Sequence, residues 1–559
     1  MGRRDGLGPA ERRRALERLR ASSGRPLDVL VVGGGVVGAG SALDAAHRGL
    51  EVGLIERTDL AAGTSSRSSR LAHGGLRYLE QGQFRLVHEA LAERGLLAEV
   101  LAPHLVAPLD FILPLTHPLQ RPYLGAGVAL YETLSRLGGH ALHTGRPRLL
   151  SGQRLAQLAP GLAVDQLAGA LTFTDAQIDD ARHTLAAART AAGLGAAIVA
   201  GAALTGLVRR RGRVVGVHAT IDDGTAEVTI HARTIVLALG PWTTAVLDRL
   251  LPSTTGAGVS AARVRRSRGS HILVPRHAID LRTAVIARTP VSVLFLLPWR
   301  DHWIIGTTDL DDDGPLDDVR ATTGEVAYLL DQANRWLTTP LTAADVVGSY
   351  AGIRPLIAAT DADTTALSRE HAIAVPAPGL VVVSGGKYTT YRVMAEDAVD
   401  AAVRELGFLG IRGIPASRTA SLPLTGAVDF AATAQRRLGI AQRFGVAPEV
   451  VDHLLRRHGD RTEDVLSLTV ADPSLAERLD PTARYLRAEV VHAAQQEGAR
   501  SVADVLERRT RLAVETRDAG SSLADDVAAL LAPTLGWDED QVRAQARAYQ
   551  ERHSTAALV

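Results

Sequence analysis

The sequence predicts an α/β (α+β) fold that combines a Rossmann-like dinucleotide-binding domain, a second domain built on an antiparallel sheet, and a C-terminal α-helical domain. Three observations carry this prediction. Residues 27–56 follow the order of an apolar strand, a glycine turn, a helix and a second strand. Residues 263–350 contain a series of strand-like segments. Residues 427–559 are rich in alanine, arginine and leucine at helical spacing.

The composition is that of a globular protein with more than one domain. At 559 residues, 46% hydrophobic and 22% charged, the chain can bury several cores. Its net charge of +1 argues against nucleic-acid binding, which usually needs a basic excess. The absence of cysteine excludes disulfides, thiolate metal sites and thiol catalysis. No uncharged apolar run reaches the ~18 residues of a transmembrane helix, so none is expected.

Residues 1–24 are basic and polar and lack the hydrophobic core of a signal peptide. The stretch from Ala10 to Arg20 favours a short basic helix with Leu16 and Leu19 on one side. We interpret this segment as a solvated tail, with contact to a membrane surface as the alternative.

The first glycine turn has the G-x-G-x-x-G spacing, at Gly33, Gly35 and Gly38. Gly33 allows the tight turn, Gly35 lets the backbone approach a pyrophosphate, and Gly38 lets the helix lie against the sheet. The helix N-terminus then points free N–H groups and the positive end of its dipole at the phosphates. Glu56 ends the second strand, where an acid holds a ribose hydroxyl. The segment therefore predicts a dinucleotide site without deciding which dinucleotide binds.

A loop rich in hydroxyl groups follows Glu56. Its hydroxyl side chains are Thr64, Ser65, Ser66, Ser68 and Ser69. Glycines at positions 63, 74 and 75 permit sharp bends in the same loop. A polar loop directly after the second strand favours a second anion contact on the same ligand. The alternative is a surface loop with an N-cap serine.

The middle of the chain indicates a flavin rather than a nicotinamide cofactor. Residues 197–233 alternate as strands around the Asp223-Gly224 turn, and an apolar strand over 234–239 ends at Gly240. A meander that returns to a buried strand is typical of flavoproteins, whereas a nicotinamide domain would continue with alternating strands and helices. Residues 379–408 then repeat a strand, a Gly-Gly turn and a helix, so the chain returns to this domain.

Lysine is almost absent from this chain. Of its 62 basic residues, only Lys387 is a lysine and all others are arginine. A lysine retained in such a composition indicates a position that needs a compact, titratable ammonium group, which arginine cannot provide. Because Lys387 follows a Gly-Gly turn at a helix N-terminus, burial there would lower its pKa and allow it to take a proton.

Six blocks, in order along the chain, carry a resemblance to a known family. They are VVGGGVVGAG, TSSRSSRLAHGGLRYLE, GSHILVP, IIGTTD, GIRPL and GGKYTTYR. Over about residues 27–400 the chain resembles the FAD-dependent glycerol-3-phosphate dehydrogenases, which belong to the larger group of D-amino-acid and glycine oxidases. The resemblance implies hydride transfer from C2 of glycerol 3-phosphate to flavin N5, with dihydroxyacetone phosphate as product and quinone as electron acceptor.

The resemblance also implies a place in the cell and a domain plan. We expect a cytoplasmic protein that associates peripherally with the inner face of the cell membrane. Whether it forms a homodimer is left undecided. The expected FAD-binding domain spans residues 25–110, 171–262 and 351–408. The expected substrate-binding domain spans residues 111–170 and 263–350, and a linker over 409–426 leads to the helical domain at 427–559.

For the substrate, the resemblance implies that Arg354 and Arg369 hold the phosphate, with Arg77 and Tyr78 lining the substrate cavity. Planar arginine donors suit a phosphate because they bind it with two hydrogen bonds. The expected catalytic residues are Lys387, Arg77, His73 and His271. Of these, Lys387 and the two histidines are alternatives for the base, and a packed core histidine is the other interpretation of His271.

For the cofactor, the implied contacts extend beyond the glycine turn. They are Gly33, Gly35, Gly38, Glu56, Arg57, Thr64, Ser65, Ser66, Ser69, Arg70, Leu71, Ala72, His73, Leu204, Gly240, Gly386 and Lys387. The sequence reads ALG at 238–240, where many flavoproteins of this type have ATG, which puts one hydrogen bond in doubt. Without cysteine, a cysteinyl-linked flavin is impossible, so we expect non-covalent FAD.

Three other functions stay open at this point. The first is an oxidase for the same substrate that uses oxygen, which the sequence hardly separates from a dehydrogenase. The second is an amino-acid or amine oxidase of the same fold; the cluster of Arg354, Arg369 and Lys387 counts against it. The third is a non-enzymatic flavin-binding scaffold, against which the retained lysine argues.

Overall fold

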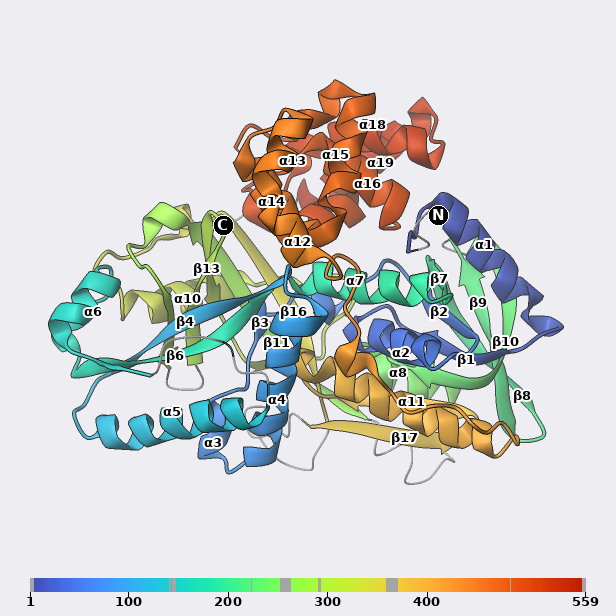
Figure 1. Cartoon of the computed structure of the whole chain (residues 1–559), viewed down its shortest axis with the longest axis horizontal. Helices are drawn as coiled ribbons and strands as arrows, with labels where there is room; N and C mark the ends of the chain where they lie inside the picture. Colours follow the sequence, from blue (N-terminus) through green and yellow to red (C-terminus); the bar gives the residue numbers. More distant parts are fainter. Residues whose placement is uncertain are drawn as a thin grey trace.

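The computed structural model describes residues 5–139, 142, 147–222, 224–251, 263–289, 293–357, 370–482 and 484–554. Two sheets lie side by side, and a helical domain packs above the junction between them (Figure 1). This arrangement confirms the predicted fold class.

The first sheet has a parallel centre and contains eight strands among the described residues. Its main order is β17-β18-β10-β1-β2-β7, and β8 and β9 join β10 as an antiparallel meander. The strands are β1 (Leu27–Val32), β2 (Val52–Glu56), β7 (Ala197–Ala200), β8 (Ala202–Arg210), β9 (Arg213–Ile221), β10 (Ala226–Leu237), β17 (His371–Ala377) and β18 (Leu380–Gly385). The central strand β1 is almost entirely apolar and buried, because helices cover both of its faces.

Helices from distant parts of the chain cover this sheet. Helix α2 (Val36–His47) packs between α7 (Asp180–Gly193) and α11 (Tyr391–Gly407) on one face. Helix α8 (Thr243–Leu250) follows β10. The 3₁₀ turns η2 (Thr64–Ser66), η5 (Gly240–Trp242) and η8 (Tyr388–Thr390) lie between these elements and border the site described below.

The N-terminal segment belongs to the core. Helix α1 (Pro9–Arg20) forms as expected, but Leu16 and Leu19 are buried against β1 and β2. Residues 5–8 are also buried, and the backbone N–H of Leu7 donates to the carbonyl of Gln496 in the helical domain (3.0 Å). The prediction of a solvated tail is therefore wrong. Two leucines one turn apart are enough to pack this basic helix against the sheet.

The second sheet is mainly antiparallel and contains ten strands among the described residues. Its main order is β15-β11-β14-β13-β12-β4-β6-β3, with β16 paired to β11 and β5 to β6. The strands are β3 (Leu71–Ala72), β4 (Val106–Leu115), β5 (Leu149–Leu150), β6 (Gly169–Ile178), β11 (Val264–Pro275), β12 (Ala284–Arg288), β13 (Val293–Trp299), β14 (His302–Gly306), β15 (Leu310–Asp311) and β16 (Gly348–Ile357).

The chain crosses from one sheet to the other at residues that differ from the predicted domain boundaries. Strands β3, β6 and most of β16 belong to the second sheet, although the sequence placed their residues in the cofactor domain. The helices on this half are α3 (Arg77–Glu80), α4 (Phe84–Leu96), α5 (Gln120–Leu137), α6 (Gly152–Leu158) and α10 (Thr323–Asn334), with a π-helical turn, η3, over Leu97–Leu101.

The described part of the C-terminal domain is mainly helical, with one isolated β-bridge between Arg478 and Leu486. Two adjoining cores hold it together. Its helices are α12 (Phe430–Gln435), α13 (Arg437–Phe444), α14 (Pro448–His458), α15 (Thr462–Ala471), α16 (Arg487–Gln496), the π-helical η12 (Asp504–Thr510), α17 (Leu512–Glu515), α18 (Ala524–Leu535) and α19 (Glu539–Ser554). Across the described part of the chain, no helix is both long and apolar enough to cross a membrane.

The N-terminal helix provides a stability test. We expect Leu19→Ala to lower the stability of the folded chain by about 2–5 kcal/mol, because it removes a fully buried leucine from a packed core. Chemical denaturation followed by circular dichroism measures this loss. Arg13→Ala, at an exposed position of the same helix, is the matched control and should change stability by less than ~0.5 kcal/mol. Equal stability of the two variants would contradict the core role of α1.

Candidate active site

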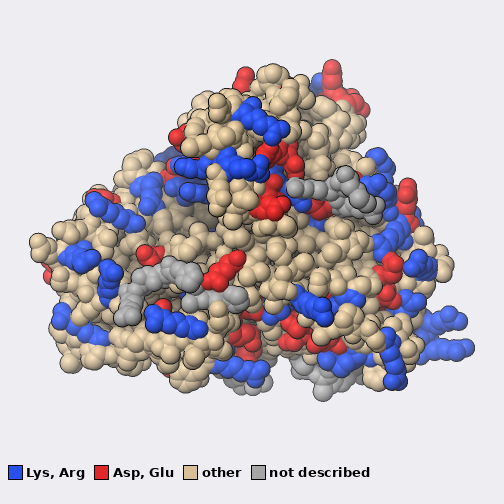
Figure 2. Space-filling model, viewed as in Figure 1, with Lys and Arg blue, Asp and Glu red and all other residues tan. Residues whose placement is uncertain are grey.

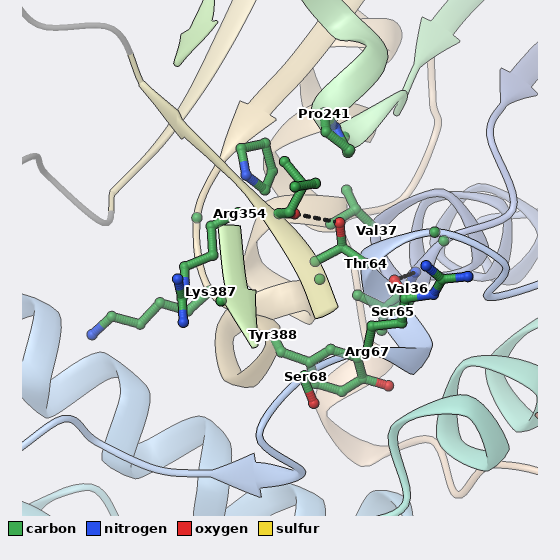
Figure 3. A pocket seen from close by; sticks show the side chains of 18 of the residues that line it. Val36, Val37, Thr64, Ser65, Arg67, Ser68, Pro241, Arg354, Lys387 and Tyr388 are labelled. Carbon is green, nitrogen blue, oxygen red and sulfur yellow. Dashed lines mark hydrogen bonds between the residues drawn. The ribbon is translucent and has the colours of Figure 1, made fainter. Parts of the chain in front are cut away.

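A cavity of about 1120 Å³ runs from the glycine turn of the first sheet to the inner face of the second. It is lined by the β1–α2 turn, the loop after β2, strand β8, the turn after β10, strand β16 and the segment from Ser384 to Thr389. Figure 3 shows side chains from the start of α2, the loop after β2, the turn after β10, β16 and the 384–389 segment around the cavity. Such a long cavity between two sheets can hold an extended ligand with a different environment at each end.

At the first end, the glycine turn brings helix α2 close to β1. Gly33 has φ +113°, a conformation that glycine adopts without strain, and a Cβ on Gly38 would overlap the carbonyl oxygen of Gly33. Gly35 caps α2 and lines the cavity, whereas Gly38 lies beneath the turn outside the lining. The helix N-terminus therefore faces the cavity, as a pyrophosphate site requires.

Glu56 lies beside this turn at the end of β2. Its carboxylate accepts hydrogen bonds from the backbone N–H of Gly34 (2.6 Å) and of Thr58 (2.9 Å). Burial raises the pKa of this carboxyl group, although both hydrogen bonds act against the rise. Glu56 thus holds the shape of the turn while it lines the cavity.

The hydroxyl side chains after β2 mostly anchor their own loop. Thr64 donates to the carbonyl of Ile353 (2.6 Å), and the Ser65 hydroxyl accepts from the backbone N–H of Val36 at the start of α2 (2.9 Å; Figure 3). Ser68 donates to the carboxylate of Asp180 (2.7 Å). The loop therefore lies fixed along the cavity wall.

The predicted cofactor residues divide into two groups in the structure. Those that line the cavity are Gly33, Gly35, Glu56, Arg57, Thr64, Ser65, Ser69, Leu71, His73, Leu204, Gly240, Gly386 and Lys387. Those outside the lining are Gly38, Ser66, Arg70 and Ala72. The Arg70 side chain is buried, with its guanidinium 4.1 Å from the Trp299 ring centroid, so it points away from the cavity.

At the other end, Arg354 projects from β16. Its guanidinium donates to the hydroxyl of Thr307 (2.8 Å) and the carbonyl of Thr308 (3.2 Å), and lies 3.5 Å from the carboxylate of Asp309. A Cβ at Gly269 on the neighbouring strand would overlap the Arg354 guanidinium. The β14–β15 connection therefore fixes the direction of this side chain.

Lys387 reaches the same end of the cavity from β18 (Figure 3). It follows Gly385 and Gly386, both at positive φ, and its Nζ lies 3.8 Å from the centroid of the Tyr78 ring. Tyr78 and Arg77, on α3, also line the cavity. The structure thus gathers three cationic side chains and a tyrosine from three separate segments.

The two histidines occupy different positions. His271 on β11 is buried, stacks on Tyr350 with ring centroids 4.7 Å apart, and shares a hydrogen bond between Nε2 and the Ser69 hydroxyl (2.8 Å). Burial, with the nearby cations Arg354 and Arg70, lowers the pKa of His271 well below its usual value, so the ring is neutral. His73 follows β3, and its backbone N–H donates to Thr389 (3.1 Å). The remaining predicted residue, Arg369, lies outside the described residues.

Comparisons with known proteins agree with this geometry. The family described as "FAD dependent oxidoreductase" matches residues 28–401, and "C-terminal domain of alpha-glycerophosphate oxidase" matches residues 417–542. Glycerol-3-phosphate dehydrogenase 2 of Mycobacterium tuberculosis is 45% identical over 553 residues, 99% of this chain and 92% of that protein. The mitochondrial glycerol-3-phosphate dehydrogenase of Bos taurus is 35% identical over 92% of this chain and 71% of its own length.

A solved relative extends the match to the fold. The glycerol-3-phosphate dehydrogenase of Bacillus halodurans, crystallised with FAD, is 26% identical, and the match covers 99% of each chain with a TM-score of 0.78. The chain belongs to the FAD-dependent glycerol-3-phosphate dehydrogenases. The predicted family and cofactor are confirmed.

FAD fits the residues of this dehydrogenase. The glycine turn leaves space where a side chain would stand, the α2 N-terminus faces that space, and the cavity continues to Lys387 without interruption. Bound in this way, FAD would have its pyrophosphate at Gly33 and Gly35, its ribose at Glu56 and its flavin end at the segment Ser384–Lys387.

The sequence prediction missed several residues of the dehydrogenase cavity. Asp175 lines it and forms a buried cluster with Arg94 (2.7 Å) and the Tyr131 hydroxyl (2.8 Å), which also accepts from the Gly74 N–H. Thr307 and Asp309 of the IIGTTD block orient Arg354; that block was recognised, but only as a family signature. The C-terminal residues Glu507, Arg508 and Arg552 also line the cavity, and no sequence motif marks them.

Proposed function

We propose that this dehydrogenase oxidises sn-glycerol 3-phosphate at C2 to dihydroxyacetone phosphate and passes the electrons to a quinone. The observation that carries the proposal is the meeting of Arg354, Arg77 and Lys387 at the end of the cavity remote from the glycine turn. A small phosphorylated alcohol complements this end, because cations are needed for the phosphate and a proton acceptor for the hydroxyl. The relatives named above are called glycerol-3-phosphate dehydrogenases, which supports the substrate and the oxidation but does not name the acceptor.

Arg354 is the proposed phosphate ligand. Thr307, Thr308 and Asp309 hold its guanidinium on one side, so it enters the cavity already oriented. An oriented guanidinium loses little side-chain entropy when it binds a phosphate with two hydrogen bonds. Arg77, with Tyr78 beside it, and Arg369 are proposed as further contacts around the substrate.

The oxidation breaks two bonds of the substrate. The bound flavin supplies the acceptor, at N5, for the hydride that leaves C2. The proton of the C2 hydroxyl must go to a side chain while the C=O bond forms. We assign this proton to Lys387 in its neutral amine form, which has a free lone pair to accept it; its Nζ lies 3.8 Å from the centroid of the Tyr78 ring at this end of the cavity. His73 is the alternative base, since the Nε2 atom of His271 is already engaged by Ser69.

To reach the quinone acceptor, we propose that the protein binds the cytoplasmic face of the membrane through α5. Four large hydrophobic side chains of α5 and its N-cap are exposed to solvent on one outward face: Leu119, Tyr123, Leu130 and Leu137. Leu124 and Val128 on its inner face pack with α3, which carries Arg77 and Tyr78. An apolar face beside the substrate end suits a lipid surface from which a quinone can reach the flavin.

The redox reaction can be tested directly. Anaerobic addition of glycerol 3-phosphate should bleach the yellow holoenzyme, because the flavin is reduced, while glycerol and alanine should not. A quinone analogue should then restore the colour without oxygen, and aerobic turnover should release little peroxide. Equal bleaching by glycerol would remove the phosphate assignment, and fast stoichiometric peroxide would favour the oxidase.

Lys387→Met tests the proton acceptor. The variant should keep its FAD but reduce it about 10²–10⁴-fold more slowly with glycerol 3-phosphate, as stopped-flow absorbance measures, because it has lost acid–base catalysis. Methionine preserves the length and the apolar stem of the side chain. A normal reduction rate in this variant would assign the proton to His73 instead.

A substitution on the exposed face of α5 should weaken membrane binding without slowing flavin reduction. Leu130→Glu should weaken binding to anionic phospholipid vesicles by about tenfold or more, since burying a leucine is worth about 1.5–3 kcal/mol. Flavin reduction by glycerol 3-phosphate should be unchanged. Val470→Glu is the control, because Val470 is also apolar and is even more exposed than Leu130 but lies in the helical domain. Equal vesicle binding by both variants in a sedimentation assay would exclude α5 as the docking surface.

A further inference from the structure

Three buried arginines connect the C-terminal domain to the cofactor domain. Arg508, Arg509 and Arg511 lie in and just after η12, and all three side chains are almost completely excluded from solvent. Their partners are on the loop after β2 and at the start of α7. Figure 1 shows the C-terminal domain seated directly above α7. The face in Figure 2 carries interspersed charges of both signs, whereas these three arginines are inside the molecule.

The first connection holds Asp59. Arg509 donates to both carboxylate oxygens (2.6 and 2.8 Å), and Arg508 donates to one of them. Burial alone would raise the pKa of Asp59, but Arg509 and Arg508 reverse this effect and hold it below the usual value. The carboxylate is therefore charged and is held by two arginines of η12.

Asp59 lies close in the chain to the residues that contact the glycine turn. Two residues further on, the backbone N–H of Ala61 donates to the carbonyl of Gly34 (2.9 Å). Leu60 is buried against Gly34, where a Cβ would approach its side chain to 2.9 Å. Fixing Asp59 therefore fixes one side of the glycine turn.

The second connection holds the hydroxyl loop. Arg511 donates to the carbonyl of Ser66 (2.9 Å) and pairs with Asp180, which in turn accepts from the N–H (3.1 Å) and hydroxyl of Ser68. Between these points, the Ser65 hydroxyl accepts from Val36 at the helix N-terminus. One C-terminal segment thus holds both ends of the loop that borders the glycine turn. Its neighbours Glu507 and Arg508 form part of the cavity wall.

We propose that the C-terminal helical domain completes the FAD site, so that its docking through Arg508, Arg509 and Arg511 and the binding of FAD favour each other. The reason is that docking orders the loop over residues 59–69 before the cofactor arrives, which removes part of the entropy cost of binding. Coupling between two sites is reciprocal, so bound FAD must also stabilise the docked η12 segment. The inference rests on the cofactor alone and holds whatever the substrate.

Substitutions on the two sides of the junction test the coupling. Asp59→Asn and Arg511→Met should each raise the dissociation constant for FAD by about tenfold or more, within the usual range for coupled sites. Fluorescence of released flavin, measured after dilution of the holoenzyme, reports this change. Arg487→Met is the matched control, because Arg487 pairs with Asp526 within the C-terminal domain and does not reach the cofactor loop. The control should bind FAD like the unmodified chain.

Hydrogen exchange of the unmodified full-length protein separates coupling from simple structural support. Amides of residues 504–512 should exchange about tenfold more slowly with FAD bound than after FAD removal, while those of α13 should not change. A purely structural junction would give equal exchange in η12 with and without FAD. That result, or unchanged FAD release in both junction variants, would overturn the proposal.

Discussion

The contact between α2 and β1 at the glycine turn is the constraint on which the site depends. Because Gly38 lacks a Cβ, the helix can lie against the carbonyl of Gly33 and its N-terminus faces the cavity. Glu56, Ser65 and Ala61 then bond to backbone groups of this one turn. A side chain at Gly38 would displace the helix, and with it the hydrogen bonds that place the loop after β2. The cofactor end is thus built mainly from backbone geometry.

The sequence predicted this end well because its parts are neighbours in the chain. The glycine spacing, the strand before it and the acid after it lie within 30 residues, and each has a local physical signature. At the substrate end, composition alone marked Lys387 as the one lysine of the chain. Arg77 and Arg354 were reached only through the family resemblance, since they come from separate segments. Asp59 is separated in the sequence from its partners Arg508 and Arg509 by 449 and 450 residues. Because the chain contains many arginines, the sequence does not indicate which of them pairs with a given carboxylate. The same reason explains the error at α1, whose burial depends on a sheet formed elsewhere.

The unusual choice of cations follows from the packing. Buried carboxylates are held by two-pronged guanidinium contacts at Asp59–Arg509 and at Glu497–Arg182, where both carboxylate oxygens accept at 2.6 Å. Arginine suits such pairs because its planar fork matches a carboxylate and its charge does not titrate. Lys387 differs in environment, since its ammonium lies over an aromatic ring at the cavity. Arginine therefore stabilises the buried carboxylates, and the lysine lies at the end of the cavity where we propose that a proton is transferred.

The C-terminal domain also contacts the second sheet, which bears on the reacting end. Glu515 accepts from the indole N–H of Trp299 on β13 (3.0 Å), and Arg517 donates to the carbonyl of Val346 just before β16. One domain thus touches both sheets. Lys387 follows β18 of the first sheet and Arg354 lies in β16 of the second, so their separation depends on how the two sheets are held together. The substrate that we propose, with its phosphate at Arg354 and its hydroxyl at Lys387, needs that separation fixed to a fraction of an ångström. The helical domain, although it has no catalytic motif of its own, contacts both the loop after β2 and the second sheet, and so links the two halves that carry these proposed contacts.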